Sequence, residues 1–315
     1  MKLLLILALS LLSGCIVVPQ TVDGNPDLPF IELEGYRFHA ETLGSADKPV
    51  AIVLHGGPGA DSRYLQEAST LLSEHFHVVV YDQRGTGLSP RVPAEQITVD
   101  SFIHDLDLFV DKFSPNQPVR LVGHSWGAML ATAYTSEHPD KVSHIVLAEP
   151  QFLDPSTANS MMSGFPGWRV IFGASSAWIN KWRVASRGDP YARDDYFILQ
   201  MLQIMQMPAE LCDGQLPELS ANRFGSPVFQ ATIGKMMADE AFAASLTFVD
   251  GIENYNGKTL LLTGACNTLY GAEYQSKHMG FFRQVRMATI EDAGHFMFND
   301  QPEKAVNLVV DFLNE

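Results

Sequence analysis

The pattern Gly-x-Ser-x-Gly at residues 123–127 places a serine where it could act as a nucleophile. This serine, Ser125, lies between an apolar run of strand length at residues 119–122 and a stretch with helical character at residues 128–137. A sharp turn from strand to helix pushes the hydroxyl out of the sheet, and the flanking glycines relieve the crowding of such a turn. The pattern alone also fits a tight turn around a passive serine, so the interpretation depends on two further motifs.

A histidine and a glycine-rich loop supply the other parts of a covalent mechanism. His295 follows the apolar run at residues 285–290, where a general base could take the proton of the Ser125 hydroxyl. Residues 55–59, His-Gly-Gly-Pro-Gly, follow another apolar run, and glycines there let backbone N–H groups approach a developing oxyanion. The expected donors are the N–H groups of Gly57 and of Trp126, the residue after the nucleophile. The alternative for this loop is a purely structural role.

These residues belong to a chain of 315 residues in which apolar runs alternate with helical periodicity. Strands are predicted at residues 30–33, 36–43, 50–55, 77–81, 119–122, 145–147, 260–263 and 285–290. Helices are predicted at residues 128–137 and 301–313 and through Phe102, Leu106, Val110 and Phe113, with Thr98 as a cap. This alternation indicates the α/β class, with a parallel sheet covered on both faces. Residues 151–257 break the alternation and predict a helical insertion between core segments 30–150 and 258–315.

The three motifs, in this order, resemble the α/β-hydrolase superfamily. Together with residues 82–89, Asp-Gln-Arg-Gly-Thr-Gly-Leu-Ser, they are similar to the proline iminopeptidase group over about residues 36–150 and 258–313. The resemblance implies an α/β-hydrolase fold with a mostly parallel eight-stranded sheet, helices on both faces, a helical cap inserted after strand six, and a Ser–His–acid triad. It also implies that residues 82–85 form a structural turn that braces the site without taking part in catalysis.

The acid of the triad is where the sequence departs from this resemblance. The turn after strand seven, which carries Asp in most such hydrolases, reads Gly-Ala-Cys-Asn and ends at Asn267, whose neutral amide cannot offset the charge of an imidazolium. Glu149 ends the strand at residues 145–147 and is the preferred candidate, a position with precedent in the haloalkane dehalogenase branch. Asp292 and an uncharged role for Asn267 remain open, and Asn267 is also a possible helper in the site. Because the nucleophile is Ser and not Asp, carbon–halogen and epoxide displacement are disfavoured.

The first fifteen residues predict export. One lysine, about ten apolar residues and the sequence Leu-Ser-Gly-Cys are typical of a signal peptide over residues 1–14, and they resemble the bacterial lipobox with lipidation at Cys15. This implies an anchor in the bacterial cell envelope, and Ile16, which is not Asp, favours the outer membrane of a Gram-negative cell. Residues 15–29 contain three prolines and predict a lipid-anchored tether. In an oxidising compartment a disulfide between Cys212 and Cys266 is possible, but the sequence cannot fix their separation.

Composition narrows the function further. Asp and Glu outnumber Lys and Arg by 36 to 21, a net charge of −15 that argues against nucleic-acid binding. The expected activity is hydrolysis of amide or ester bonds in small, apolar substrates or peptides through an acyl-enzyme, without a metal or cofactor, as an aminopeptidase or as a carboxylesterase. Methionines at positions 201, 205 and 207 could line an apolar pocket or pack in the core. The rival interpretation is a non-catalytic envelope lipoprotein that uses this fold as a binding module. The oligomeric state stays open.

Overall fold

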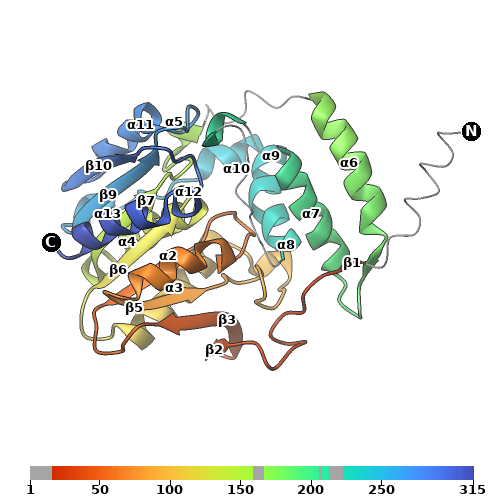
Figure 1. The fold of residues 1–315 in the computed structure, drawn as a ribbon, viewed down its shortest axis with the longest axis horizontal. Helices are drawn as coiled ribbons and strands as arrows, with labels where there is room; N and C mark the ends of the chain where they lie inside the picture. Colours follow the sequence, from red (N-terminus) through yellow and green to blue (C-terminus); the bar gives the residue numbers. More distant parts are fainter. Residues whose placement is uncertain (1–15, 159–166, 206–207, 213–222) are drawn as a thin grey trace, which may run out of the picture.

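The computed structural model describes residues 16–158, 167–205, 208–212 and 223–315, and it is shown in Figure 1. The predicted signal peptide at residues 1–14 and the predicted lipidation site at Cys15 lie outside the described residues. Two layers of helices enclose a central sheet, and a group of further helices lies to one side of this core in the view of Figure 1.

The central sheet has eight strands, as the sequence predicts. Its spatial order is β10-β9-β7-β6-β4-β5-β3-β2; β2 and β3 pair antiparallel to each other and β3 pairs antiparallel to β5, whereas every other neighbouring pair is parallel. The strands are β2 (Phe30–Leu33), β3 (Tyr36–Leu43), β4 (Val50–Leu54), β5 (His77–Tyr81), β6 (Val119–His124), β7 (Val142–Ala148), β9 (Lys258–Gly264) and β10 (Val285–Ile290). The carboxyl ends of the parallel strands share one edge, so the loops that follow them can meet there.

Successive residues of each inner strand face opposite layers of helices. On β4, Ile52 and Leu54 pack in the cluster that includes α3 and α4, whereas Ala51 and Val53 pack in the cluster that includes α2 and α13. This alternation follows from the two-residue period of a strand and explains why the strands are continuous apolar runs. The core helices are α2 (Gln66–Leu72), α3 (Val99–Phe113), α4 (Trp126–Glu137), α11 (Ala272–Gln275), α12 (Met297–Asp300) and α13 (Pro302–Leu313).

Local signals set the ends of two of these helices. Thr98 caps α3, because its hydroxyl accepts the N–H of Ser101 while the Ser101 hydroxyl oxygen accepts the N–H of Thr98. Pro302 begins α13, where its missing N–H would have no helical partner. Helix α4 begins two residues earlier than its apolar pattern predicts, directly after Ser125.

The insertion follows β7, the sixth strand of the central sheet, and forms a cap built mainly of helices. Its helices are α5 (Pro155–Ala158), α6 (Gly167–Lys181), α7 (Ala192–Met205), α8 (Ser226–Phe229), α9 (Lys235–Ala238) and α10 (Glu240–Ser245), with a π-helical turn at Gln230–Gly234. Of the methionines predicted there, Met207 lies outside the described residues. Within the described ranges, no helix is both long and apolar enough to cross a bilayer.

Buried charges join the cap to the core. Asp195 on α7 is fully buried, and its carboxylate accepts hydrogen bonds from Arg91 of the core at 2.9 Å and from Arg223 of the cap at 2.6 Å. It also accepts the N–H of Ser226 at the start of α8. Charges this far from water are stable only when they are paired, so the group specifies how the cap sits on the core.

The segment after residue 15 is not the free tether that its prolines predict. Strand β1 (Ile16–Val17) pairs with β8 (Val184–Ala185) of the cap, and the chain then crosses to the core. There Val22 is completely buried and its N–H donates to the carbonyl of Leu88. The prolines do not make this segment a free tether, because the backbone pairing and the burial of the Val22 side chain stabilise a docked conformation. A proline-rich sequence does not exclude such docking.

Candidate active site

Ser125 lies on a strained turn between β6 and α4. Its backbone has φ 54° and ψ −118°, a left-handed conformation that non-glycine residues rarely adopt. A side chain at Gly123 would come within 2.3 Å of the Gly127 carbonyl oxygen, and one at Gly127 within 2.2 Å of the Leu54 oxygen. Both flanking positions therefore require glycine, and the turn matches the geometry in which a strand-end serine presents its hydroxyl.

His295 lies beside the carboxylate of Glu149. The His295 Nδ1 atom is 2.9 Å from Glu149 Oε2, and both side chains are buried. Because a carboxylate only accepts, the Nδ1–H donates, which leaves the Nε2 of the neutral ring as a proton acceptor. Burial by itself lowers the pKa of His295, but the hydrogen bond and charge of Glu149 outweigh it and hold the pKa above its ordinary value.

The Glu149 carboxylate accepts four hydrogen bonds from groups that can only donate to it. Besides His295, these come from the hydroxyl of Thr263 and the N–H of Gly264, both at 2.8 Å, and from Asn267 Nδ2 at 2.7 Å. The amide of Asn267 has a fixed orientation, since its oxygen accepts the N–H groups of residues 269 and 270. Asn267, which occupies the position expected for the acid, thus holds in place the carboxylate of Glu149, which follows strand β7.

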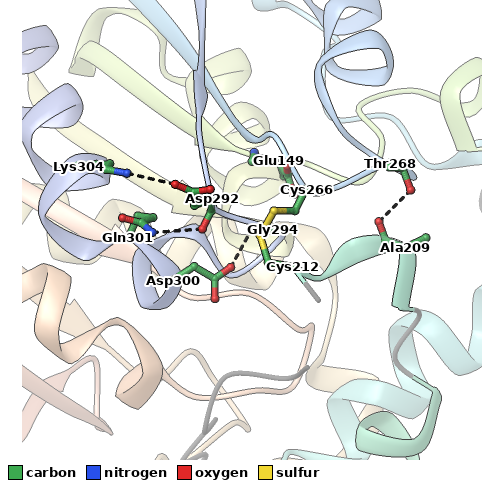
Figure 2. Close-up of a disulfide and its surroundings, with 11 residues drawn as sticks. Glu149, Ala209, Cys212, Cys266, Thr268, Asp292, Gly294, Asp300, Gln301 and Lys304 are labelled. Atoms are coloured by element: carbon green, nitrogen blue, oxygen red, sulfur yellow. Dashed lines mark hydrogen bonds and ion pairs between the residues drawn. A yellow bond between two sulfur atoms is a disulfide. The ribbon is translucent and has the colours of Figure 1, made fainter. Parts of the chain in front are cut away.

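Asp292, the third candidate for the acid, lies away from the imidazole. Its side chain is 82% exposed and pairs with Lys304 at 3.8 Å. In Figure 2 the Asp292 carboxylate points towards Lys304. Of the three candidates, the structure brings Glu149 to His295 and places Asn267 behind it.

The glycine-rich loop lies directly against Ser125. A side chain at Gly56 would come within 3.0 Å of the Ser125 Cβ, so the backbone of the loop borders the serine. Gly57 has φ 135°, a conformation that needs glycine. Trp126 is the first residue of α4, and the N–H groups of a first helical turn have no partner within the helix. Of the two predicted donors, Trp126 directly follows the serine, and Gly57 directly follows the glycine that borders it.

A hydrogen-bonded chain that the sequence does not reveal links this loop to the His295 loop. The Gly56 N–H donates to the Tyr64 hydroxyl, which donates to His124 Nδ1, and His124 Nε2 donates to the carbonyl of His295; each distance is 2.7 Å. Burial, assisted by the nearby His295, lowers the pKa of His124 to about 3, so its ring is neutral and can donate and accept at once. Tyr64 is 60 residues from His124, and no local pattern marks the pair.

The turn at residues 82–85 braces the site, in line with its predicted structural role. The Gln83 N–H donates to His55 Nε2, and its side-chain amide donates to the His55 carbonyl. The Gln83 side-chain oxygen accepts the indole N–H of Trp126. One residue therefore fixes the glycine-rich loop to the residue that follows Ser125.

A disulfide holds a cap segment against the same loops. Cys212 and Cys266 are bonded, with their Cα atoms 5.0 Å apart, which settles the pairing that the sequence leaves open (Figure 2). The Ala209 carbonyl accepts the N–H of Thr268, and the Glu210 carbonyl accepts the N–H of His295 at 2.7 Å. Burial raises the pKa of the Glu210 carboxyl, which lies near the charges of His295 and Glu149.

An apolar cavity of about 130 Å³ lies between core and cap. Its walls include Pro58 and Trp126, which directly follow Gly57 and Ser125, and Phe152 and Phe248 of the cap. Lys235 is the one ionisable side chain among the described residues that line it. In the described part of the chain, no group of three or more His, Cys, Asp or Glu side chains is placed to hold a metal ion.

Comparisons with known proteins agree with this architecture. The chain is 30% identical over 120 residues to the proline iminopeptidase PfmaB of Pestalotiopsis fici, covering 38% of this chain and 42% of that protein. It is 29% identical over 134 residues to a proline iminopeptidase of Lactobacillus helveticus, covering 41% and 44%. The matches thus span about two fifths of these relatives.

Solved structures match over most of the chain. A haloalkane dehalogenase variant from Bradyrhizobium elkanii superimposes with a TM-score of 0.63 at 17% identity, covering 91% of this chain and 95% of that one. A serine hydrolase, CCSP0084, from a Cycloclasticus bacterium gives 0.62 at 16%, covering 91% and 97%. The model of the alpha/beta hydrolase fold family matches residues 49–302. The chain therefore belongs to the alpha/beta hydrolase fold family.

Proposed function

We propose that the chain is a serine hydrolase that cleaves ester or amide bonds of small apolar substrates. The contact between His295 and Glu149 carries the proposal, together with the strained turn at Ser125, whose N–H donates to the carbonyl of Ala148, the residue before Glu149. A buried carboxylate that orients an imidazole, next to a strand-end hydroxyl, is the arrangement that activates serine in acyl transfer.

In this mechanism His295 Nε2 takes the proton of the Ser125 hydroxyl while the oxygen attacks the substrate carbonyl carbon. The carbonyl oxygen becomes an oxyanion and accepts the N–H groups of Gly57 and Trp126. His295 then gives its proton to the leaving alcohol or amine, and an acyl-serine remains. Water, deprotonated by the same imidazole, releases the acid and restores the serine. Glu149 keeps Nδ1 protonated and stabilises the imidazolium in both halves.

The cavity between core and cap defines the preferred substrate group. Its volume of about 130 Å³ is comparable with a cavity of roughly 150 Å³ that holds benzene. No carboxylate of the described residues lines it, so it offers no charged partner to an ammonium group. We therefore infer that it takes an uncharged acyl group about the size of a six-carbon ring, which favours the carboxylesterase over the aminopeptidase.

One observation supports the aminopeptidase as second candidate. Glu210 is a cap residue whose carboxyl lies near His295 and Glu149, where it could receive the α-amine of a substrate. Esters of phenylacetic or cyclohexanecarboxylic acid should be turned over faster than prolyl anilide under the first assignment. The reverse order, together with loss of prolyl anilide turnover in Glu210→Gln, would establish the second.

Labelling with a fluorophosphonate probe tests the serine itself. We expect the wild-type protein to be labelled, Ser125→Ala to remain unlabelled, and Ser136→Ala to be labelled like the wild type. Ser136 is a suitable control because it is a second buried serine, on α4, and its hydroxyl donates to backbone carbonyls. Folded wild-type protein that resists the probe at every pH would instead support the non-catalytic binding module.

We also propose that the protein is exported and lipid-anchored at Cys15, on the sequence of residues 1–15 alone. Metabolic labelling with a radioactive fatty acid should mark the wild-type protein and leave Cys15→Ser unmarked. Label in both proteins, or in neither, contradicts the assignment.

A further inference from the structure

Four exposed apolar side chains gather near the N-terminal end of the described chain. Val17, Trp178, Ile179 and Trp182 are each 53–62% exposed, and they are four of the six large apolar side chains that the described residues expose. The two indole rings contact each other edge to face, with centroids 6.2 Å apart. Contiguous apolar groups on a surface mark a contact site, because single exposed residues are normal but clusters are not.

Backbone pairing fixes the N-terminal segment at this cluster. The N–H of Ile16 donates to the carbonyl of Arg183, the residue directly after Trp182. Ile16 and Val17 lie in register with Val184 and Ala185, and Figure 1 shows β1 beside the end of α6. In the sequence Cys15, the proposed lipidation site, immediately precedes Ile16, the first residue of this pairing.

Cations lie beside one of the two indoles, that of Trp182. The Arg193 guanidinium lies 5.3 Å from the Trp182 ring centroid and the Lys181 ammonium 5.9 Å from it, and Arg187 is exposed on the same connection. The carboxylates of this region are paired, Asp189 and Asp195 with Arg223 and Asp194 with Lys181. A chain with a net charge of −15 thus presents arginines beside its aromatic surface, which suits anionic headgroups.

We propose that the face formed by Val17, Trp178, Ile179 and Trp182 lies on the surface of a lipid bilayer; the proposal draws on the lipid anchor at Cys15 but is tested separately from it. Tryptophan prefers the headgroup level, where its ring is buried and its N–H stays hydrated. Lipid anchors hold a protein durably when a second membrane signal acts with them, and the aromatic face supplies that signal at the point of attachment. The protein then has a fixed orientation, with its cap against the membrane and the central sheet farther from it.

Tryptophan quenching in vesicles tests the orientation. The full chain, purified from membranes in detergent, is reconstituted into vesicles of equal parts phosphatidylcholine and phosphatidylglycerol, with and without brominated acyl chains. We expect strong quenching in the wild type, loss of most of it in the Trp178→Phe/Trp182→Phe double variant, and its retention in Trp126→Phe, which removes a buried indole. A blue shift of the emission on addition of vesicles should accompany the quenching.

A second variant separates orientation from anchoring. Trp178→Ser/Ile179→Ser/Trp182→Ser changes exposed side chains only, and it should release a larger fraction of the chain from vesicles in a flotation assay, most clearly when Cys15→Ser is added. Unquenched wild-type tryptophans, or quenching that the double Phe variant retains, would overturn the proposal. The proposal would also be overturned if the wild type is a dimer in detergent, the triple Ser variant is a monomer, and no quenching is seen. That result would assign the face to contact with a second copy of the chain.

Discussion

Replacing Glu149 by Gln changes one oxygen for an NH₂ group and tests the catalytic assignment directly. The carboxylate accepts from Thr263, Gly264, Asn267 and His295. A glutamine has one accepting oxygen, so its NH₂ group must face two of these donors. Asn267 cannot turn its oxygen towards the new NH₂, because that oxygen already accepts two backbone N–H groups.

Two partners can adapt: the Thr263 hydroxyl, which can also accept, and the His295 imidazole, which can change its tautomer. If the oxygen of the substituted side chain remains with Thr263 and Gly264, its NH₂ faces the imidazole, which then accepts at Nδ1 and carries its proton on Nε2. That tautomer cannot take the proton of Ser125. The same tautomer change in a serine protease triad lowers kcat about 10⁴-fold, which corresponds to about 5 kcal/mol of transition-state stabilisation.

The assay compares single turnover and kcat on an activated ester of an apolar acid. We expect kcat to fall roughly 10⁴-fold in Glu149→Gln. The control Asp292→Asn changes an exposed carboxylate on the loop before His295, and its kcat should stay within about twofold of the wild type, as is usual for surface substitutions. Circular dichroism controls for folding. A Glu149→Gln enzyme within about tenfold of the wild type, or an equal loss in Asp292→Asn, would refute the reasoning.

Three further outcomes follow from the same geometry. Because His295 must be neutral to act as a base and its pKa is raised above 6.5, kcat/KM should fall as the pH drops through a value above 6.5. In Glu149→Gln the residual activity should show this acidic fall at lower pH, since burial alone lowers the pKa of His295. The same pH profile in both proteins would contradict the coupling between His295 and Glu149. Cys266→Ser removes the covalent link to residues 209–212, the segment that holds the His295 N–H. We therefore expect kcat to fall between about 10- and 100-fold at temperatures where the protein is folded. Full activity in this variant, or in the wild type treated with dithiothreitol, would argue that the disulfide does not position His295. Asp195→Ala leaves the buried Arg91 without its carboxylate partner and takes one of two carboxylates from Arg223. It should lower the free energy of unfolding by about 3–5 kcal/mol in urea titration, whereas a change below about 1 kcal/mol would mean that the buried pairs add little.

Those parts of the site that lie within one strand–loop–helix unit could be predicted from the sequence. The elbow at Ser125 and the loop at Gly57 each follow an apolar strand, and glycines mark the positions where a side chain would collide. Glu149 could be proposed because the carboxyl ends of neighbouring parallel strands meet at one edge, and β7 does lie beside β9. The sheet followed from the same apolar periodicity.

The missed features depend on contacts between distant segments. The chain from Gly56 to His295 joins two loops through Tyr64, which lies in a 3-10 turn, and His124, the last residue of β6, and each of its members looks ordinary in its own neighbourhood. The docking of the N-terminal segment was mispredicted for a similar reason: its prolines describe the free peptide, whereas Val22 is buried by side chains that other segments supply.

The bond between Cys212 and Cys266 also acts on the unfolded chain. It spans 54 positions of sequence, and closing a loop of that length removes conformational freedom from the denatured ensemble equivalent to about 4 kcal/mol at 25 °C. The last helices of the cap and strand β9 fall inside this loop. The alignment of the catalytic base and the resistance of the chain to denaturation therefore share one covalent link, and a compartment that keeps thiols oxidised protects both.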